Sequence, residues 1–382
     1  MNTKKRLTLC CTILLAILSL GCKRTEISKP ADKHINSENY KLYKLYAGYS
    51  NSFILKPDGT LWAAGENTVW MFGTDNEGGV YTSPVKILDD VSEISVGAGY
   101  LLAVKKDKTL WISGWDALSM QTYKQFTKIA DNIISSKAFH APATPIGIAL
   151  KSDNTLWVIH TTTSSAGYQL QKIKDNVIKI EAGEQHALIL TKDNTVWGYG
   201  NNLAGQLGVG DNNADVPNGY ANSPVKIMEH VRDMAAGFLH TLILQEDHSI
   251  WAMGSNGNGQ LGDGTTVDRT VPVKIMNEAI SISCGYYHSH VIKKDFSLWA
   301  MGNNYRGQLG DGTTIDRSTP KRITDNVIKV SDGSLHTIIL KSDSSFWVTG
   351  SNEYGQLGIG ESGLGAGNTN FSSTFIKMNI TK

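Results

Sequence analysis

The 382-residue chain carries 36 Lys and Arg residues against 35 Asp and Glu residues, a formal net charge of +1 at pH 7. This balance excludes a strongly basic nucleic-acid-binding face, which would need an excess of cationic side chains. Loss of the first 21 residues would remove three cations and change the net charge to −2. We therefore expect no nucleic acid among the partners of this protein.

The first 21 residues have the pattern of an export signal. A basic start at residues 4–6 precedes the apolar run Leu7–Leu20, which is too short for a comfortable membrane span. The run ends in Leu18-Ser19-Leu20-Gly21-Cys22, which resembles a bacterial lipoprotein signal with Cys22 as the lipidated residue. Leu18 stands one place earlier than is usual in that pattern. An ordinary secretory signal with an incidental cysteine is the alternative.

The segment after the signal is polar and lacks an apolar period, which is typical of a tether. We predict a signal peptide at residues 1–21, lipidated Cys22 and a flexible tether at 22–40, and a folded body at 41–382. The resemblance implies a lipoprotein anchored to the membrane of a bacterial cell envelope or surface. Cys10 and Cys11 would leave with the signal, so Cys284 would remain as a single free thiol without a disulfide partner.

The body contains the same sequence motif seven times, and a repeat of this length determines the fold. Trp-to-Trp steps range from 40 residues (Trp157 to Trp197) to 54 residues (Trp197 to Trp251), and an Asp stands four residues before each Trp. The seven tryptophans are Trp62, Trp111, Trp157, Trp197, Trp251, Trp299 and Trp347. We expect each of them to pack between neighbouring repeats, because Trp offers the largest apolar area.

The fourth repeat shows how one unit folds. Three stretches with strand character follow one another: Val177 to Ala182 alternates, His186 to Leu190 is apolar, and Thr195 to Tyr199 is rich in β-formers. A Gly/Asn loop then leads to a short fourth strand at Ser223 to Ile227. Four antiparallel strands, repeated seven times, predict an all-β fold: a seven-bladed β-propeller of four-stranded antiparallel blades. The sequence leaves open whether the last strand completes its own blade or is shared with the first.

Repeats four to seven carry a further motif, Gly-Asn-Asn or Gly-Ser-Asn, two residues, then Gly-Gln-Leu-Gly, as at Gly200 to Gly208. With the Gly-x-x-His turn and the Asp-x-Thr-x-Trp run, it resembles the repeat of the regulator of chromosome condensation family. That resemblance implies a seven-bladed propeller over about 340 residues, but it does not determine function. The eukaryotic founder of the family is a nucleotide-exchange factor for a nuclear GTPase, a role that an exported chain would not share. Secreted bacterial members include a β-lactamase-inhibiting protein, so the resemblance favours protein binding.

Two sets of polar residues are better explained by structure than by chemistry. His186, His240, His288 and His336 occupy one repeat position, and we expect each to bond a neighbouring strand or turn. Asp263 and Asp268, like Asp311 and Asp316, stand in loops that superficially resemble calcium sites but lack the full ligand set. The other histidines show no metal-ligand spacing. We therefore expect no catalytic residue, no metal and no cofactor.

One face is the candidate binding surface. In an antiparallel blade the Gly-x-x-His turn and the Gly/Asn loop emerge on the same side, which we name the Gly-x-x-His face. The residues after the turn glycine vary while their surroundings repeat, and aromatic and Arg side chains carry much binding energy at interfaces. The candidate rim residues are Tyr49, Trp70, Tyr100, Trp115, Phe238, Leu239, Tyr286, Tyr287, Tyr305, Arg306 and Tyr354.

Three functions are compatible with this sequence. The favoured hypothesis is an envelope-anchored, monomeric propeller that binds an unknown protein, or alternatively a glycan, through the Gly-x-x-His face. The alternative is a propeller enzyme, a lyase or hydrolase acting on a cell-surface polymer or small molecule, which would need convergent single-copy acids, bases or metal ligands. The third is a purely architectural surface component.

Overall fold

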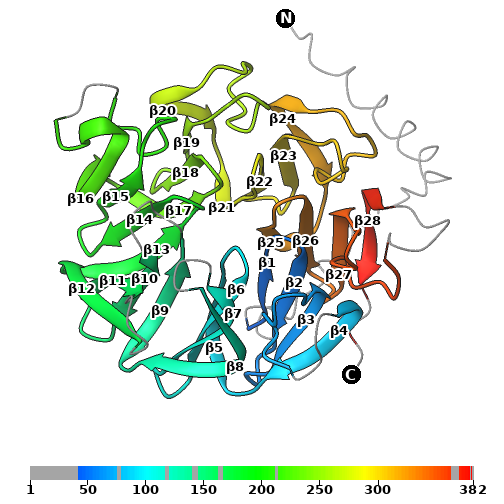
Figure 1. Cartoon of the computed structure of the whole chain (residues 1–382). Coiled ribbons are helices and arrows are strands. Elements are labelled where there is room, and N and C mark those ends of the chain that lie inside the picture. Colours follow the sequence, from blue (N-terminus) through cyan, green and yellow to red (C-terminus); the bar gives the residue numbers. More distant parts are fainter. Residues whose placement is uncertain are drawn as a thin grey trace, which may run out of the picture. The chain divides into compact units, whose positions relative to one another are not determined.

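The computed structural model describes residues 42–74, 79–116, 120–139, 145–161, 167–210, 214–362, 370–378 and 380. The chain divides into two compact units, Met1–Ser37 and Glu38–Lys382, and the first unit, with the predicted signal peptide, lies outside the described residues. Within the second unit, seven four-stranded antiparallel sheets form a ring (Figure 1). The prediction of a seven-bladed all-β propeller is confirmed. No helix of the described segments is long and apolar enough to cross a membrane.

Each blade is built from four consecutive strands, with the first strand nearest the ring centre and the fourth outermost (Figure 1). The first three blades comprise β1 (Lys44–Ala47), β2 (Asn51–Leu55), β3 (Leu61–Glu66), β4 (Val80–Leu88); β5 (Val91–Val96), β6 (Tyr100–Lys105), β7 (Leu110–Asp116), β8 (Gln121–Ala130); β9 (Ile133–Ala138), β10 (Pro145–Lys151), β11 (Leu156–Thr161), β12 (Tyr168–Lys174). The fourth and fifth comprise β13 (Val177–Ala182), β14 (His186–Thr191), β15 (Val196–Asn201), β16 (Tyr220–Met228); β17 (Val231–Ala236), β18 (His240–Gln245), β19 (Ile250–Gly254), β20 (Arg269–Met276). The last two comprise β21 (Ala279–Cys284), β22 (His288–Lys293), β23 (Leu298–Gly302), β24 (Arg317–Thr324); β25 (Val327–Asp332), β26 (His336–Lys341), β27 (Phe346–Ser351), β28 (Phe371–Met378). A short 3-10 turn, η1 (Pro217–Gly219), precedes β16.

The hydrophobic core lies between blades rather than within one blade. Phe53 and Leu61 of the first blade share a buried cluster with Ile94 and Leu101 of the second, and Trp111 packs against that cluster. The second strand is buried on both faces, as in β14, because each blade is covered by two neighbours. The predicted packing between blades is confirmed for five of the seven repeated tryptophans, because the same arrangement holds for Trp197, Trp251, Trp299 and Trp347.

The Asp-x-Thr-x-Trp run is a hydrogen-bonded turn between the second and third strands. In the first blade Asp58 Oδ1 accepts from the backbone N–H and the hydroxyl of Thr60, at 2.8 and 2.7 Å. The Thr60 hydroxyl oxygen in turn accepts from Trp62 Nε1 at 3.1 Å. The Asp therefore closes the turn, and the Thr orients the indole ring.

The last strand completes its own blade. β28 pairs with β27, and the ring is closed by contacts between the first and seventh blades rather than by a shared strand. Ser334 N donates to Gly48 O at 3.0 Å, and Ala47 N donates to Ser331 Oγ at 3.0 Å. The question that the sequence left open is thus settled in favour of seven contiguous blades.

A repeated buried hydrogen bond joins one blade to the next. His186 Nε2 lies 2.9 Å from Thr241 Oγ1, and that hydroxyl donates to Gln206 O at 2.7 Å. The hydroxyl proton is committed to the carbonyl, so Nε2 carries the hydrogen and donates it across the bridge. The same contact joins His240 to Ser289, His288 to Thr337 and, across the closure, His336 to Ser52. The expected structural role of these four histidines is confirmed.

Burial makes these histidines sensitive to pH. It lowers the pKa of His186 to about 3, because the charged imidazolium would lose its hydration in the fully buried site. Between the unfolded pKa near 6.5 and the folded value, the unfolded chain binds more protons, so stability falls as the pH decreases through this window. From pH 7 to pH 5 the loss is about 2 kcal/mol for one such histidine.

We predict that His186→Asn makes stability less dependent on pH. Asn51 occupies the equivalent position in the first blade, so the fold has a precedent for the substitution. Denaturant unfolding at pH 7 and pH 5 should show a difference smaller than that of the parent by about 2 kcal/mol. His230→Asn, at an exposed turn, is the control and should keep the parental difference. If the difference in stability between pH 7 and pH 5 were the same in His186→Asn as in the parent, the lowered pKa of His186 would be contradicted.

Candidate functional site at the channel mouth

The two loop types of the Gly-x-x-His face are hydrogen-bonded to each other. In the fourth blade Asn201 N, at the start of the Gly/Asn loop, donates to Gln185 O of the Gly-x-x-His turn at 2.9 Å. The equivalent bonds run from Ser255 N to Leu239 O and from Asn303 N to Tyr287 O. The predicted sharing of one face by these loops is therefore confirmed.

From the fourth blade through the seventh to the first, the turn glycines of consecutive blades touch around the central channel. A Cβ atom at Gly183 would lie 1.9 Å from Gly237 O, and one at Gly333 would lie 2.4 Å from Gly48 O. Only glycine permits this approach of backbone to backbone. The turns of six blades, together with Ala138 and Phe139 of the third blade, surround a cavity of about 120 Å³, which we name the channel mouth.

Four of the candidate rim residues form one aromatic cluster at the channel mouth. Tyr286 lies at its centre, with ring centroids 5.1 Å from Tyr49, 5.0 Å from Phe238 and 6.1 Å from Tyr287. Phe238 also contacts Tyr287 edge-on at 5.5 Å. These side chains come from the first, fifth and sixth blades, so the ring closure brings them together. Tyr49 is 52% exposed and the other three are half-buried, which leaves aromatic surface open to solvent.

Glu184 adds a carboxylate to this cluster. Tyr286 donates its hydroxyl to Glu184 Oε2 at 3.0 Å, across the mouth from the sixth blade to the fourth. Burial, followed by the negative charge of Glu184, raises the pKa of Tyr286, so the phenol stays protonated and keeps donating. Glu184 follows the turn glycine Gly183 and was not among the predicted rim residues. Its distance of 102 residues from Tyr286 gave no indication of this contact.

Most other candidate rim residues lie on the same face without joining the cluster. Lys124 Nζ lies 4.8 Å from the Trp70 ring, and the Arg306 guanidinium lies 5.6 Å from the half-exposed ring of Tyr305. Trp115 is 37% exposed. Leu239 and Tyr354 are half-buried.

Tyr100 departs from the expected rim. Its side chain is fully buried between the second and third blades and donates its hydroxyl to Ile146 O at 2.5 Å. It occupies the repeat position of the bridging histidines, and it takes over their role of joining blades. Because the ring has no exposed surface, Tyr100 offers no contact to a partner.

Below the mouth, charged side chains of the inner strands form an ion-pair chain. Lys137 Nζ of β9 lies 3.2 Å from Glu93 Oε1 and 3.1 Å from Glu181 Oε2, carboxylates of the two neighbouring blades. Lys179 continues the chain, from Glu181 at 3.3 Å to Asp233 at 2.5 Å. This ion-pair network could not be predicted from the sequence, because its members come from four different repeats.

Lys137 and Glu181 of this ion-pair network keep each other in the charged form. Burial alone would lower the pKa of Lys137, but Glu181 and Glu93 outweigh it and raise that pKa. Burial would likewise raise the pKa of Glu181, and the two lysines lower it instead. Lys137 and Glu181 are therefore held in their charged forms, which makes them unsuited to transfer protons near neutral pH.

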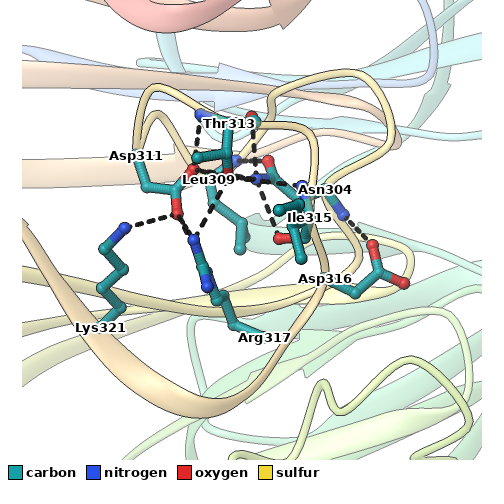
Figure 2. A network of polar contacts seen from close by, with 8 residues as sticks. All are labelled: Asn304, Leu309, Asp311, Thr313, Ile315, Asp316, Arg317 and Lys321. Carbon is teal, nitrogen blue, oxygen red and sulfur yellow. Dashed lines mark hydrogen bonds and ion pairs between the residues drawn. The ribbon is translucent and has the colours of Figure 1, made fainter.

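The Asp-rich loops are internally satisfied turns. Figure 2 shows Arg317 and Lys321 pointing at Asp311, whose Oδ2 they approach at 2.7 and 2.9 Å. Asp311 Oδ1 accepts from Thr313 and from Asn304 Nδ2. Burial would raise the pKa of Asp311, but its donors, Thr313 first, lower it. The equivalent loop of the fifth blade pairs Asp263 with Arg269 and Thr265 in the same way. Because donors occupy both carboxylates, the arrangement matches the interpretation of these loops as turns.

The fold and its repeated motifs define a propeller of the regulator of chromosome condensation class. The RCC1-like domain family matches residues 152–378, and the chain belongs to that family. The match begins in the third repeat and covers all four repeats that carry the Gly-Gln-Leu-Gly loop.

Relatives with known names share the repeat over limited stretches. The chain is 36% identical over 107 residues to the ultraviolet-B receptor UVR8 of Arabidopsis thaliana, covering 27% of this chain and 23% of the receptor. It is 33% identical over 114 residues to an RCC2 homolog of Xenopus laevis, covering 30% of this chain and 21% of that protein. The alignments thus span about a quarter or less of these curated relatives.

Solved structures share the whole fold. Prp20p of Saccharomyces cerevisiae, studied for binding to Gsp1p and histones, superposes with a TM-score of 0.70 at 17% identity, covering 90% of this chain and 89% of that one. Human WBSCR16 gives a TM-score of 0.66 at 19% identity, covering 78% and 86%. At these identities the likeness shows the fold alone.

We predict that Lys137→Met destabilises the ring. The substitution leaves Glu93 and Glu181 near each other without their shared cation, and removal of one partner of a buried ion pair costs about 3 kcal/mol. Thermal and denaturant unfolding at pH 7 measure this loss, which should shrink at pH 5 as the carboxylates protonate. Lys86→Met breaks an exposed pair with Asp89 and should cost less than about 1 kcal/mol. Equal unfolding of the two variants would contradict the role of Lys137.

Proposed function

We propose that this protein is an envelope-anchored propeller that binds a partner protein through the Gly-x-x-His face. The observation that carries the proposal is the exposed aromatic cluster of Tyr49, Phe238, Tyr286 and Tyr287 at the channel mouth. Aromatic side chains held on a rigid frame are typical anchors of protein interfaces. The proteins of the same fold named above include one studied for its binding to other proteins, which supports an interaction role.

The chemistry of the mouth favours a partner that inserts a cationic or apolar side chain. Ring faces attract a Lys or Arg cation, and Glu184 adds a carboxylate beside them. A neutral glycan that stacks on the rings would use the same surface, so the partner class is decided by experiment.

Affinity capture tests the face. The bait is the soluble form, residues 24–382, beside a variant with Phe238, Tyr286 and Tyr287 changed to Ala, both exposed to native envelope and medium. We expect a protein that the parent retains and the folded variant loses at least tenfold, since a single anchor contributes about 2 kcal/mol or more.

A control variant addresses loss of apolar surface in general. Ile134→Ala, Ile178→Ala and Phe296→Asn remove exposed apolar side chains at the opposite ends of the strands, beside the Asp turns. This variant should retain the partner. Equal retention by all three baits, or by none, would overturn the proposed face and favour the enzyme alternative, which turnover assays on envelope polymers would then test.

The anchoring part of the proposal rests on the export pattern and on Cys22, outside the described residues. We expect the parent in the membrane fraction with incorporated palmitate. Cys22→Ser should abolish the label and release the exported propeller from the membrane. A Cys22→Ser protein that still sediments with membranes would contradict lipid anchoring.

A further inference from the structure

Two buried polar side chains break the repeat at neighbouring positions. His290, on β22, stands where other blades place Leu188, Leu242 or Ile338. Asp332, at the end of β25 in the next blade, stands where they place Ala182, Ala236 or Cys284. Both exceptions occur once, and they face each other across the interface between the sixth and seventh blades.

Together with the bridging His288 they form a compact set of ligand atoms. His290 Nδ1 lies 2.8 Å from Asp332 Oδ1, and His288 Nε2 lies 3.5 Å from the same oxygen. One ligand atom from each residue fits within a span of 4.8 Å. Ligands on a tetrahedral zinc ion, at bond lengths of about 2.0–2.2 Å, stand roughly 3.3–3.5 Å apart. The set therefore needs small side-chain shifts to hold such an ion, and His288 Nε2 would exchange its contact with Thr337 Oγ1 for the bond to the metal.

The cluster is polar beyond what its hydrogen bonds satisfy. All three side chains are fully buried. Among the described residues, Asp332 Oδ2 and His290 Nε2 have no hydrogen-bond partner, and the close Nδ1 contact is not aligned for a hydrogen bond. Asp332 Oδ1 accepts a hydrogen bond from Thr337 Oγ1 at 3.0 Å, but a buried carboxylate is still costly unless a cation compensates its charge.

We propose that His288, His290 and Asp332 form a binding site for a divalent transition-metal ion of the zinc type, between the sixth and seventh blades. Two imidazoles and one carboxylate are a donor set that zinc accepts, and a carboxylate can bind through both oxygens, which engages the unpaired Oδ2. A proton shared between His290 and Asp332 would instead leave that oxygen unpaired. Asp332 also lines the channel mouth, which places the buried cluster close to solvent.

The site has a structural role, since its ligands come from two blades. Binding to the folded ring and not to the unfolded chain stabilises the ring by linkage. This proposal is independent of the proposed partner-binding function and is tested separately.

Titration of the chelator-stripped full chain, without a histidine tag, with Co²⁺ and Zn²⁺ tests the site. We expect one Co²⁺ per chain, visible ligand-field absorption typical of nitrogen and oxygen ligands, displacement by Zn²⁺, and a higher Tm with either ion. His290→Leu, Asp332→Ala and the double variant should lose both the absorption and the Tm increase. These changes restore residues that other blades carry, so the metal-free variants should fold.

The exposed His230→Asn is the matched control and should bind as the parent does. The absence of stoichiometric binding by the parent would overturn the proposal and identify the cluster as a proton-linked ion pair. Equal binding by the parent and the double variant would overturn it as well, because the ion would then lie elsewhere.

Discussion

The bridge from a buried imidazole to a hydroxyl of the next blade is the contact on which the ring depends. It ties His186 to Thr241, and the same hydroxyl reaches the carbonyl of Gln206 in the loop of the preceding blade. The imidazole, the hydroxyl and the carbonyl thus join two strands and a loop from two blades. The loop is itself closed by its own glutamine, whose Oε1 accepts from Ala204 N at 3.0 Å. The glutamine of the Gly-Gln-Leu-Gly motif therefore serves the junction between blades, and buried polar atoms without such partners would be costly.

Closure of the ring uses this bond again and needs no exchanged strand. His336 of the last blade bridges to Ser52 of the first at 2.9 Å, as if the first blade were an eighth repeat. With the frame fixed in this way, the two residues after each turn glycine are free to vary. At this rim the aromatic cluster and Glu184 come together, on turns whose backbones stack through Gly183 and Gly237. The close backbone packing therefore constrains the turn glycine, whereas the two residues after it can vary.

What could be predicted from the sequence follows from repetition. The strand order, the face shared by two loop types and the bridging role of the histidines recur at the same position in each repeat. A prediction made for one repeat therefore applies to the others. Contacts between unlike positions of different repeats could not be predicted, because the register of one blade against the next is a tertiary property. Lys137 meets Glu93 and Glu181 only in the closed ring. Tyr100 illustrates the converse error, since its place after the turn glycine suggested a rim and its bridging position required burial.

The residues that depart from the repeat distinguish this protein from a propeller of identical blades. An apolar residue at the position of His290, or alanine at that of Asp332, would pack as it does in the other blades. Either polar residue alone would be a liability, because each would be buried without a counterpart. Together, on adjoining blades and beside His288, they form one set with opposite charge preferences. Their pairing across a blade boundary indicates that the polar character of this junction is a property of the pair, and that it should be altered at both positions at once.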